Sequence, residues 1–110
     1  MAHRSARARQ VDFPRIREAA RAIAPSLVPA MLPNGKRIAH EWLALNPRRS
    51  DKSLGSFKVN MFTGAWADFA TGDYGGDIIS LFGFIADCNA VEAAKMVADF
   101  VGISPWQGGR

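Results

Sequence analysis

The chain has 110 residues, which is enough for one domain with a single hydrophobic core and too short for a catalytic domain with an accessory one. Hydrophobic residues make up 48% and charged residues 22%, so the composition excludes a wholly disordered chain. The formal net charge is +4, and the single cysteine excludes an internal disulfide and a metal site built from several cysteines.

The N-terminal residues are basic and poor in apolar side chains. Residues 1–10 contain Arg4, Arg7 and Arg9, and no sizeable apolar side chain besides Met1. Residues 1–11 are therefore predicted to form a flexible basic arm, without the apolar region of a secretory signal. The longest strongly apolar stretch, residues 78–86, is about half the ~20 residues that span a bilayer. We therefore expect a cytoplasmic protein that makes no contact with a membrane.

Positive charge is concentrated in the first half of the chain. Residues 1–58 hold twelve Lys or Arg and four Asp or Glu, whereas residues 59–110 hold two and six. Such asymmetry favours a basic face or arm that meets a polyanion such as nucleic acid. A solvated basic surface without a ligand is the alternative, because runs of charge are commonly only exposed.

The first ordered element is predicted to be a helix over residues 12–24. Phe13, Ile16, Ala20 and Ile23 recur at helical spacing, and Asp12 can cap the helix. The prolines that follow argue against regular helix and predict a connecting loop that ends in a turn before Lys36. These are Pro25, Pro29 and Pro33.

Three strands are predicted in the middle of the chain, over residues 41–45, 56–61 and 65–69. The second strand alternates, with Phe57, Val59 and Met61 on the inner face and Lys58 on the outer one. A short turn at Thr63 joins it to the third strand, which requires antiparallel pairing. Residues 48–55 are predicted to be a loop.

Two further helices are predicted after a glycine-rich turn at residues 71–76. The first covers residues 77–87 with Asp77 as its N-cap. The second covers residues 90–102, beginning after Asn89 and ending at Gly102. The expected fold is α+β: a small three-stranded antiparallel sheet packed with about three helices in a domain over residues 12–103. Residues 104–110 form a C-terminal tail, from which Trp106 is expected to pack back.

Several short motifs occur in a characteristic order along this domain. They are Asn46-Pro47-Arg48-Arg49, the run Lys52 to Phe57, Trp66-Ala67-Asp68-Phe69-Ala70-Thr71, Gly75-Gly76-Asp77-Ile78-Ile79-Ser80 and Val91-Glu92-Ala93-Ala94. In this order they resemble the Cys-His-Cys-Cys zinc-binding domain of bacterial and phage DNA primases, over about residues 12–103. The form without cysteines is similar to primase-like proteins of phages, plasmids and other mobile elements.

The resemblance places Asn46, Arg49, Asp68 and Thr71 at the family's four zinc-ligand positions, so it implies a zinc-ribbon-like fold without metal or other cofactor. Packing then has to replace a contribution on the order of 10 kcal/mol in small zinc domains. The candidates are aromatic packing by Trp42, Phe57, Trp66 and Phe69, and pairing of Asp68 with Arg48 or Arg49.

The resemblance also implies a function, which is binding of single-stranded DNA template by a sheet face and its adjoining loop. By position, the nucleic-acid-binding residues are Arg48, Arg49, Lys52, Lys58, Lys36, Arg37 and Trp42. The implied partners are single-stranded DNA and a primase catalytic domain or helicase. The alternative is a protein–protein interaction module in the replication complex of a mobile element.

No catalytic constellation stands out in the sequence. Cys88 has no evident histidine partner, His3 and His40 lie in the arm and near a strand, and the carboxylates do not cluster as they do around two catalytic metals. We therefore expect no enzymatic activity from the module itself. A replacement metal site from His40, Asp68, Asp73 and Cys88 is a further alternative, but their spacing matches no known ligand pattern.

Overall fold

The computed structural model describes residues 9–48 and 54–108, which form four helices and a five-stranded sheet. The elements are α2 (Phe13–Ala22), α3 (Ala24–Met31), β1 (Lys36–Ile38), β2 (Glu41–Ala44), β3 (Phe57–Asn60), β4 (Trp66–Asp68), β5 (Tyr74–Gly75), α4 (Ile78–Ala86) and α5 (Ala90–Val101). The predicted α+β class is confirmed, with more strands and one more helix than expected.

The sheet is antiparallel throughout, and its strands follow one another in chain order from β1 to β5. The predicted strands correspond to β2, β3 and β4. The two added strands lie at the edges and have three and two residues. All three residues of β1 are exposed, so this strand has no buried alternation from which it could be predicted.

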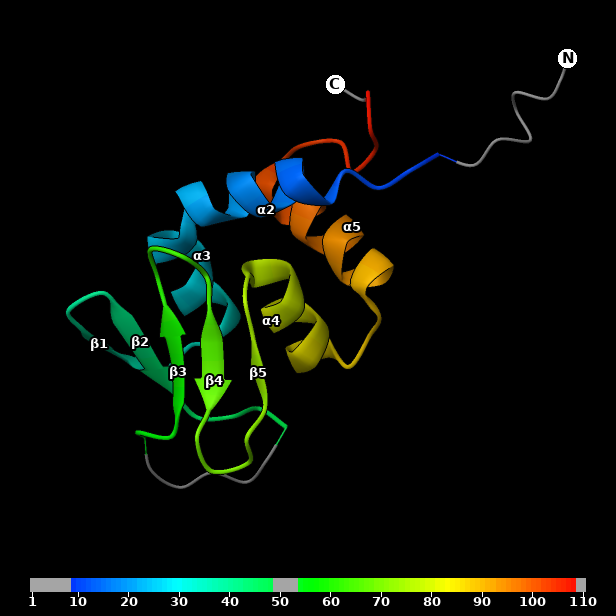
Figure 1. The fold of residues 1–110 in the computed structure, drawn as a ribbon. Coiled ribbons are helices and arrows are strands. Elements are labelled where there is room, and N and C mark those ends of the chain that lie inside the picture. Colours follow the sequence, from blue (N-terminus) through cyan, green and yellow to red (C-terminus); the bar gives the residue numbers. More distant parts are fainter. Residues whose placement is uncertain (1–8, 49–53, 109–110) are drawn as a thin grey trace, which may run out of the picture.

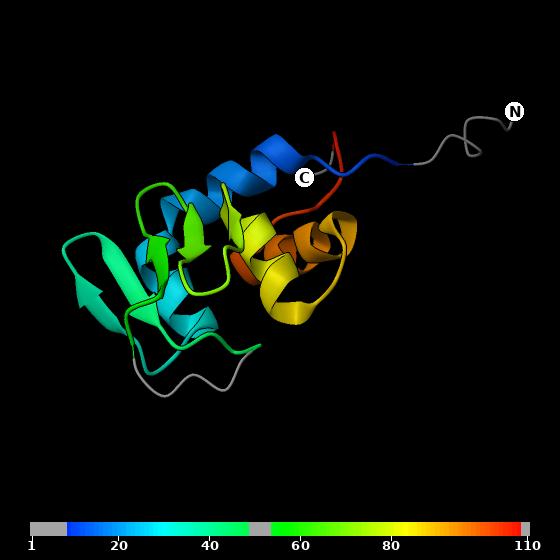
Figure 2. The ribbon, with the colours of Figure 1, turned by 60° about the horizontal axis from the view of Figure 1, so that its bottom comes forward.

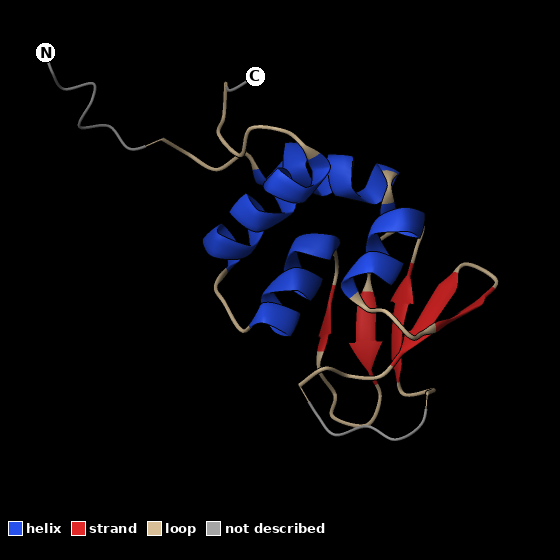
Figure 3. Cartoon of the chain, turned by 180° about the vertical axis from the view of Figure 1, so that it is seen from behind, coloured by secondary structure: helices blue, strands red, loops and turns tan. Residues whose placement is uncertain are grey.

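The helices lie on one side of the sheet (Figure 1). Seen from behind, α3 lies in front of the strands, and the other helices lie beside and above them (Figure 3). Phe57 and Val59 of β3 are fully buried, and Met61 directly after it is nearly so, which confirms the predicted alternation. Rings from the sheet and α4 interlock, since Trp66 lies 4.7 Å from Phe84 and Phe57 lies 6.0 Å from Trp66. The inner face of the sheet is therefore the face that packs against α4.

Both C-terminal helices begin and end as predicted from local signals. Asp77 caps α4 by accepting a hydrogen bond from the amide of Ser80, and Asn89 caps α5 by accepting one from Glu92. Gly102 ends α5 in the left-handed conformation, with φ of 80°. Each helix has both a strong cap and a buried stripe, and that combination made them predictable.

The prediction of a loop after Pro25 is wrong, because residues 24–31 form α3. Pro25 lies in the first turn, where its missing N–H would have had no partner within the helix. Pro29 does interrupt the helix interior, but Leu27 and Val28 on the same helix are buried in the core. Burial of this helix outweighs the loss of one backbone hydrogen bond.

The two ends of the described chain lie side by side. Val11 forms a bridge with Trp106, the amide of Asp12 donates to Pro105, and the amide of Gln107 donates to Gln10. Trp106 therefore packs back as expected. Figure 2 shows the β1–β2 hairpin at one edge of the molecule and α5 toward the opposite edge. No helix in the described ranges is long and apolar enough to cross a membrane.

Candidate nucleic-acid interface

The sheet has an outer face, which we define as the side that the helices leave uncovered. Strand pairing places Lys36, Leu43, Lys58, Ala67 and Tyr74 in one row across all five strands, each opposite the next. Paired residues point to the same side of a sheet. Because the neighbouring row contains the buried Val59 and Trp66, the row from Lys36 to Tyr74 lies on the outer face.

Two aromatic rings stand exposed on this outer face. Tyr74 is 80% exposed, and Phe69, the residue after β4, is 72% exposed. The amide of Phe69 donates to the carbonyl of Ser56, so strand pairing continues for one residue and turns the ring outward. The Nζ atom of Lys58 lies 5.6 Å from the centre of the Phe69 ring. Exposed rings beside cations can stack on bases while the cations meet phosphates.

The prediction that Phe69 packs around the positions of the family's zinc ligands is wrong, because its ring is exposed. Its neighbour Asp68 takes the inward position and is fully buried. Period-two alternation from Trp66 and Asp68 would have placed Ala67 and Phe69 outward. The same signal could not have found Tyr74, because β5 is too short to show a pattern.

The structure separates the predicted binding residues into distinct groups. Lys36 and Lys58 lie in the outer row, whereas Arg37 and Trp42 lie in the neighbouring one. The indole of Trp42 is half-buried, and its Nε1 atom donates to the carbonyl of Leu32 at 2.9 Å. Trp42 therefore packs on the helical side. Arg37 is exposed, and its Nε atom donates to Ala39 within the hairpin.

Arg48 lies away from the outer face, against α4. Its guanidinium is 3.3 Å from a carboxylate oxygen of Asp87 and 5.2 Å from the centre of the Phe84 ring. Arg48 therefore pairs with Asp87 and not with Asp68, which was one of its two predicted partners. The alternative pairing of Asp68 with Arg49 involves a residue outside the described ranges. Arg49 and Lys52, the other predicted loop contacts, lie outside the described residues.

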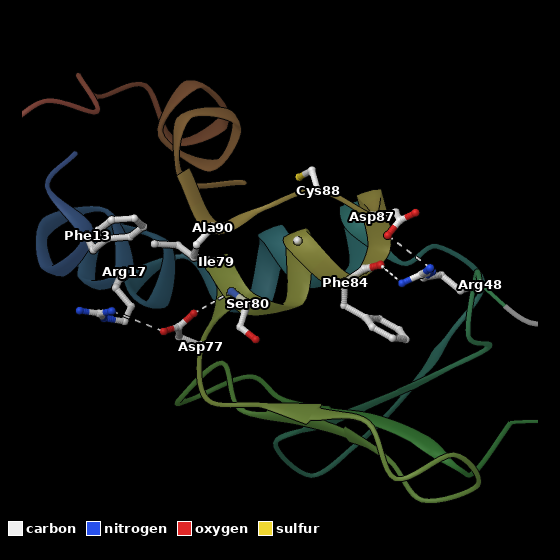
Figure 4. A pocket seen from close by; sticks show the side chains of 11 residues that line it. Phe13, Arg17, Arg48, Asp77, Ile79, Ser80, Phe84, Asp87, Cys88 and Ala90 are labelled. Carbon is white, nitrogen blue, oxygen red and sulfur yellow. Dashed lines mark hydrogen bonds and ion pairs between the residues drawn. The ribbon is translucent and has the colours of Figure 1, made fainter. Parts of the chain in front are cut away.

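A pocket of about 530 Å³ runs beside α4 between two ion pairs (Figure 4). Arg48 and Asp87 stand at one end, and Arg17 with Asp77, 3.6 Å apart, stand at the other. Each of these cations faces a carboxylate, which leaves little excess charge to attract a phosphate. Of the two surfaces, the outer face of the sheet is the better candidate for nucleic acid.

Three of the four residues that the motif resemblance aligns with zinc ligands lie together at the end of the sheet. Asn46 and Asp68 are buried, and the Nδ2 atom of Asn46 donates to Asp68 at 2.7 Å. The second carboxylate oxygen of Asp68 accepts from the amide of Ala70. The amide of Thr71 donates to the Asp68 carbonyl, while its hydroxyl donates to Asp73. The fourth position, Arg49, is outside the described residues.

The residues considered for a replacement metal site do not converge. Within residues 9–48 and 54–108, no three His, Cys, Asp or Glu side chains lie close enough to hold a metal ion. His40 instead stacks on Phe62, with ring centres 4.9 Å apart. Cys88 lies half-buried in the pocket beside α4.

Comparisons with protein-family models, with curated proteins and with solved structures found no match. The resemblance to primase zinc-binding domains therefore stays a prediction from the ordered motifs.

Proposed function

We propose that this chain is a single-stranded DNA-binding module of a primase or primase-helicase system, non-catalytic by itself, and that DNA lies across the outer face of its sheet. The observation that carries the proposal is the outer row with Lys36, Lys58 and Tyr74, beside the exposed ring of Phe69. Aromatic side chains interleaved with cations are what single-strand binding surfaces use.

The exposure of these rings costs free energy in water, since apolar surface is better buried. Phe69 and Tyr74 are the two most exposed large hydrophobic side chains of the described residues. Bases stacked on them would bury that surface, and Lys58 beside Phe69 would meet the backbone that connects the bases. The motif resemblance likewise implies single-stranded DNA bound by a face of the sheet.

Fluorescence anisotropy with a short labelled oligothymidylate at low salt tests the proposal. Phe69→Ala and Tyr74→Ala are each expected to weaken binding by about 1–3 kcal/mol, the usual contribution of one stacked base. Phe100→Ala is the matched control, because Phe100 is 64% exposed but lies on α5, away from the sheet. Absence of binding, or equal loss in all three variants, would contradict the proposal.

Salt dependence provides a second measurement on the same samples. The logarithm of the binding constant is expected to fall with the logarithm of salt concentration by about 0.7 per phosphate contact. Lys58→Ala should make that slope shallower by about 0.7, the value for one lost phosphate contact. The triple change Arg48→Ala, Arg49→Ala and Lys52→Ala tests whether the loop adds contacts of its own.

A protein–protein interaction module is the second candidate, favoured by an apolar surface on α5. Phe100 is 64% exposed and Met96 is 45% exposed, and the ring of Phe100 lies 5.8 Å from that of Phe82 on α4. The strands lie on the other side of α4 (Figure 4). If this surface mediates self-association, size-exclusion chromatography should show concentration-dependent elution that Phe100→Ser removes. If neither the unmodified chain nor Phe100→Ser changes its elution volume with concentration, self-association through Phe100 is excluded.

A further inference from the structure

A shallow hollow of about 250 Å³ lies on the outer face over β2, β3 and β4. Its polar lining residues are Glu41, Lys58 and Asn60, and its apolar ones are Ala65, Trp66, Ala67 and Phe69. Pockets for drug-sized ligands are larger, at about 300–1,000 Å³. The small side chains of Ala65 and Ala67 in the lining leave space for a flat ring beside Phe69.

Glu41 is unexpected in this lining, because it places a negative charge on a face proposed to bind DNA. It is half-buried and lies directly opposite Asn60 in the strand register. Among the described residues, its carboxylate makes no ion pair, although Lys58 lines the same hollow. On a face that meets phosphates, a carboxylate would weaken binding by repulsion. It can favour binding only where a ligand brings hydrogen-bond donors to it.

Asn60 presents a donor to the same hollow. Its Oδ1 atom accepts hydrogen bonds from the amides of Phe62 at 2.8 Å and Thr63 at 3.1 Å. These two bonds hold the β3–β4 turn and fix which end of the side-chain amide faces the backbone. The Nδ2 group is therefore the polar group that Asn60 can offer to a ligand.

The arrangement is an acceptor-only carboxylate next to an amide donor, and it matches one base best. The Watson–Crick edge of guanine carries two adjacent N–H donors, which a carboxylate can accept together, followed by a carbonyl oxygen that needs a donor. Cytosine and adenine offer only an amino group to a carboxylate, and thymine places its single N–H between two oxygens that would repel it. Single strands expose this edge for recognition.

We propose that Glu41, Asn60 and Phe69 form a subsite that recognises guanine in single-stranded DNA. The base packs against Phe69, donates N1–H and N2–H to Glu41, and accepts at O6 from Asn60 Nδ2. Lys58 contacts the adjoining phosphate. This inference rests on the proposed function and adds base preference to it.

Anisotropy titrations of the whole chain test the subsite with oligothymidylates that carry one central guanine, cytosine or adenine. The guanine oligonucleotide is expected to bind roughly five-fold or more tightly than the unsubstituted one, the lower end for a bidentate base contact. Glu41→Gln should abolish this preference while leaving oligothymidylate binding equal or tighter, since it removes a negative charge. Phe69→Ala should weaken binding of every oligonucleotide.

Asn60→Asp is a second variant that separates recognition from folding. Its side chain keeps an oxygen for the turn and loses the donor, so guanine preference should disappear while thermal melting shows a folded protein. Equal affinity for all four oligonucleotides would overturn the subsite and leave the proposed function standing. Guanine preference that survives Glu41→Gln would also overturn it. Failure of every oligonucleotide to bind would overturn both proposals.

Discussion

At the scale of single residues, the buried pair of Asn46 and Asp68 has the clearest structural role. Asp68 is fully buried, and its two carboxylate oxygens accept from Asn46 Nδ2 and from the amide of Ala70. The side chain therefore joins the end of β2 to the turn after β4, two segments that a metal ion would join in the family that the motifs resemble.

Replacement of Asp68 by alanine is expected to destabilise the fold by about 1–3 kcal/mol, because it leaves buried donors without acceptors. Urea unfolding followed by circular dichroism measures this change. Asp73→Ala is the matched control: Asp73 is an exposed carboxylate in the same turn and should change stability by less than about 0.5 kcal/mol. Similar stabilities for the two variants would show that Asp68 is not a structural link.

At the scale of elements, the strength of local signals decided what the sequence could predict. Helices α4 and α5 were predictable because each has a capping side chain and a buried stripe. Helix α3 was not, because its prolines speak against a helix and only burial of Leu27 and Val28 in the folded chain overrides them. Strands β1 and β5 have too few residues for a pattern and form by pairing with a neighbour.

Pro29→Ala tests this account of α3. The change restores a backbone donor inside the helix, and part of that gain is offset by greater freedom of the unfolded chain. We expect a net stabilisation of about 1–2 kcal/mol, measured by urea unfolding. Pro25→Ala is the control, since Pro25 lies in the first turn and should give no gain. Stabilisation by the control but not by Pro29→Ala would contradict the explanation.

At the candidate site, too, only residues with a clear local sequence signal could be predicted. Lys36 and Lys58 were predicted as binding residues and lie in the outer row. Trp42 was also predicted to bind DNA, but its indole donates a hydrogen bond to the carbonyl of Leu32. Leu32 lies between α3 and β1, and the spacing of residues in the sequence does not show that this segment comes close to Trp42. Glu41 was not predicted as a binding residue, because the sequence does not show that the sheet places it beside Asn60 and Lys58.

At the scale of the whole molecule, side-chain contacts join the sheet to the helices where the zinc-binding domains that the motifs resemble would hold a metal. Phe57, Trp66 and Phe84 join the sheet to α4, and the polar link between Asn46 and Asp68 closes the end of the sheet. If the resemblance holds, these contacts have to replace a zinc contribution on the order of 10 kcal/mol.

Addition of a strong chelator is therefore expected to leave the Tm unchanged, as measured by differential scanning fluorimetry. Subsequent addition of zinc should also cause no shift. A zinc-dependent domain in the same buffer serves as the control and should melt at a lower temperature with chelator. A Tm that falls with chelator and recovers with zinc would show that metal does contribute.

Because β1 lies at the edge of the sheet, Lys36 and Arg37 have a second role besides the proposed contact with DNA. Beyond β1 no other described strand pairs with it, so its outward backbone groups are open to a strand from another molecule. Charged side chains on an edge strand oppose such pairing and the aggregation that follows. Neutralising these residues to study DNA binding would also remove this protection, so light scattering belongs beside every titration of such variants.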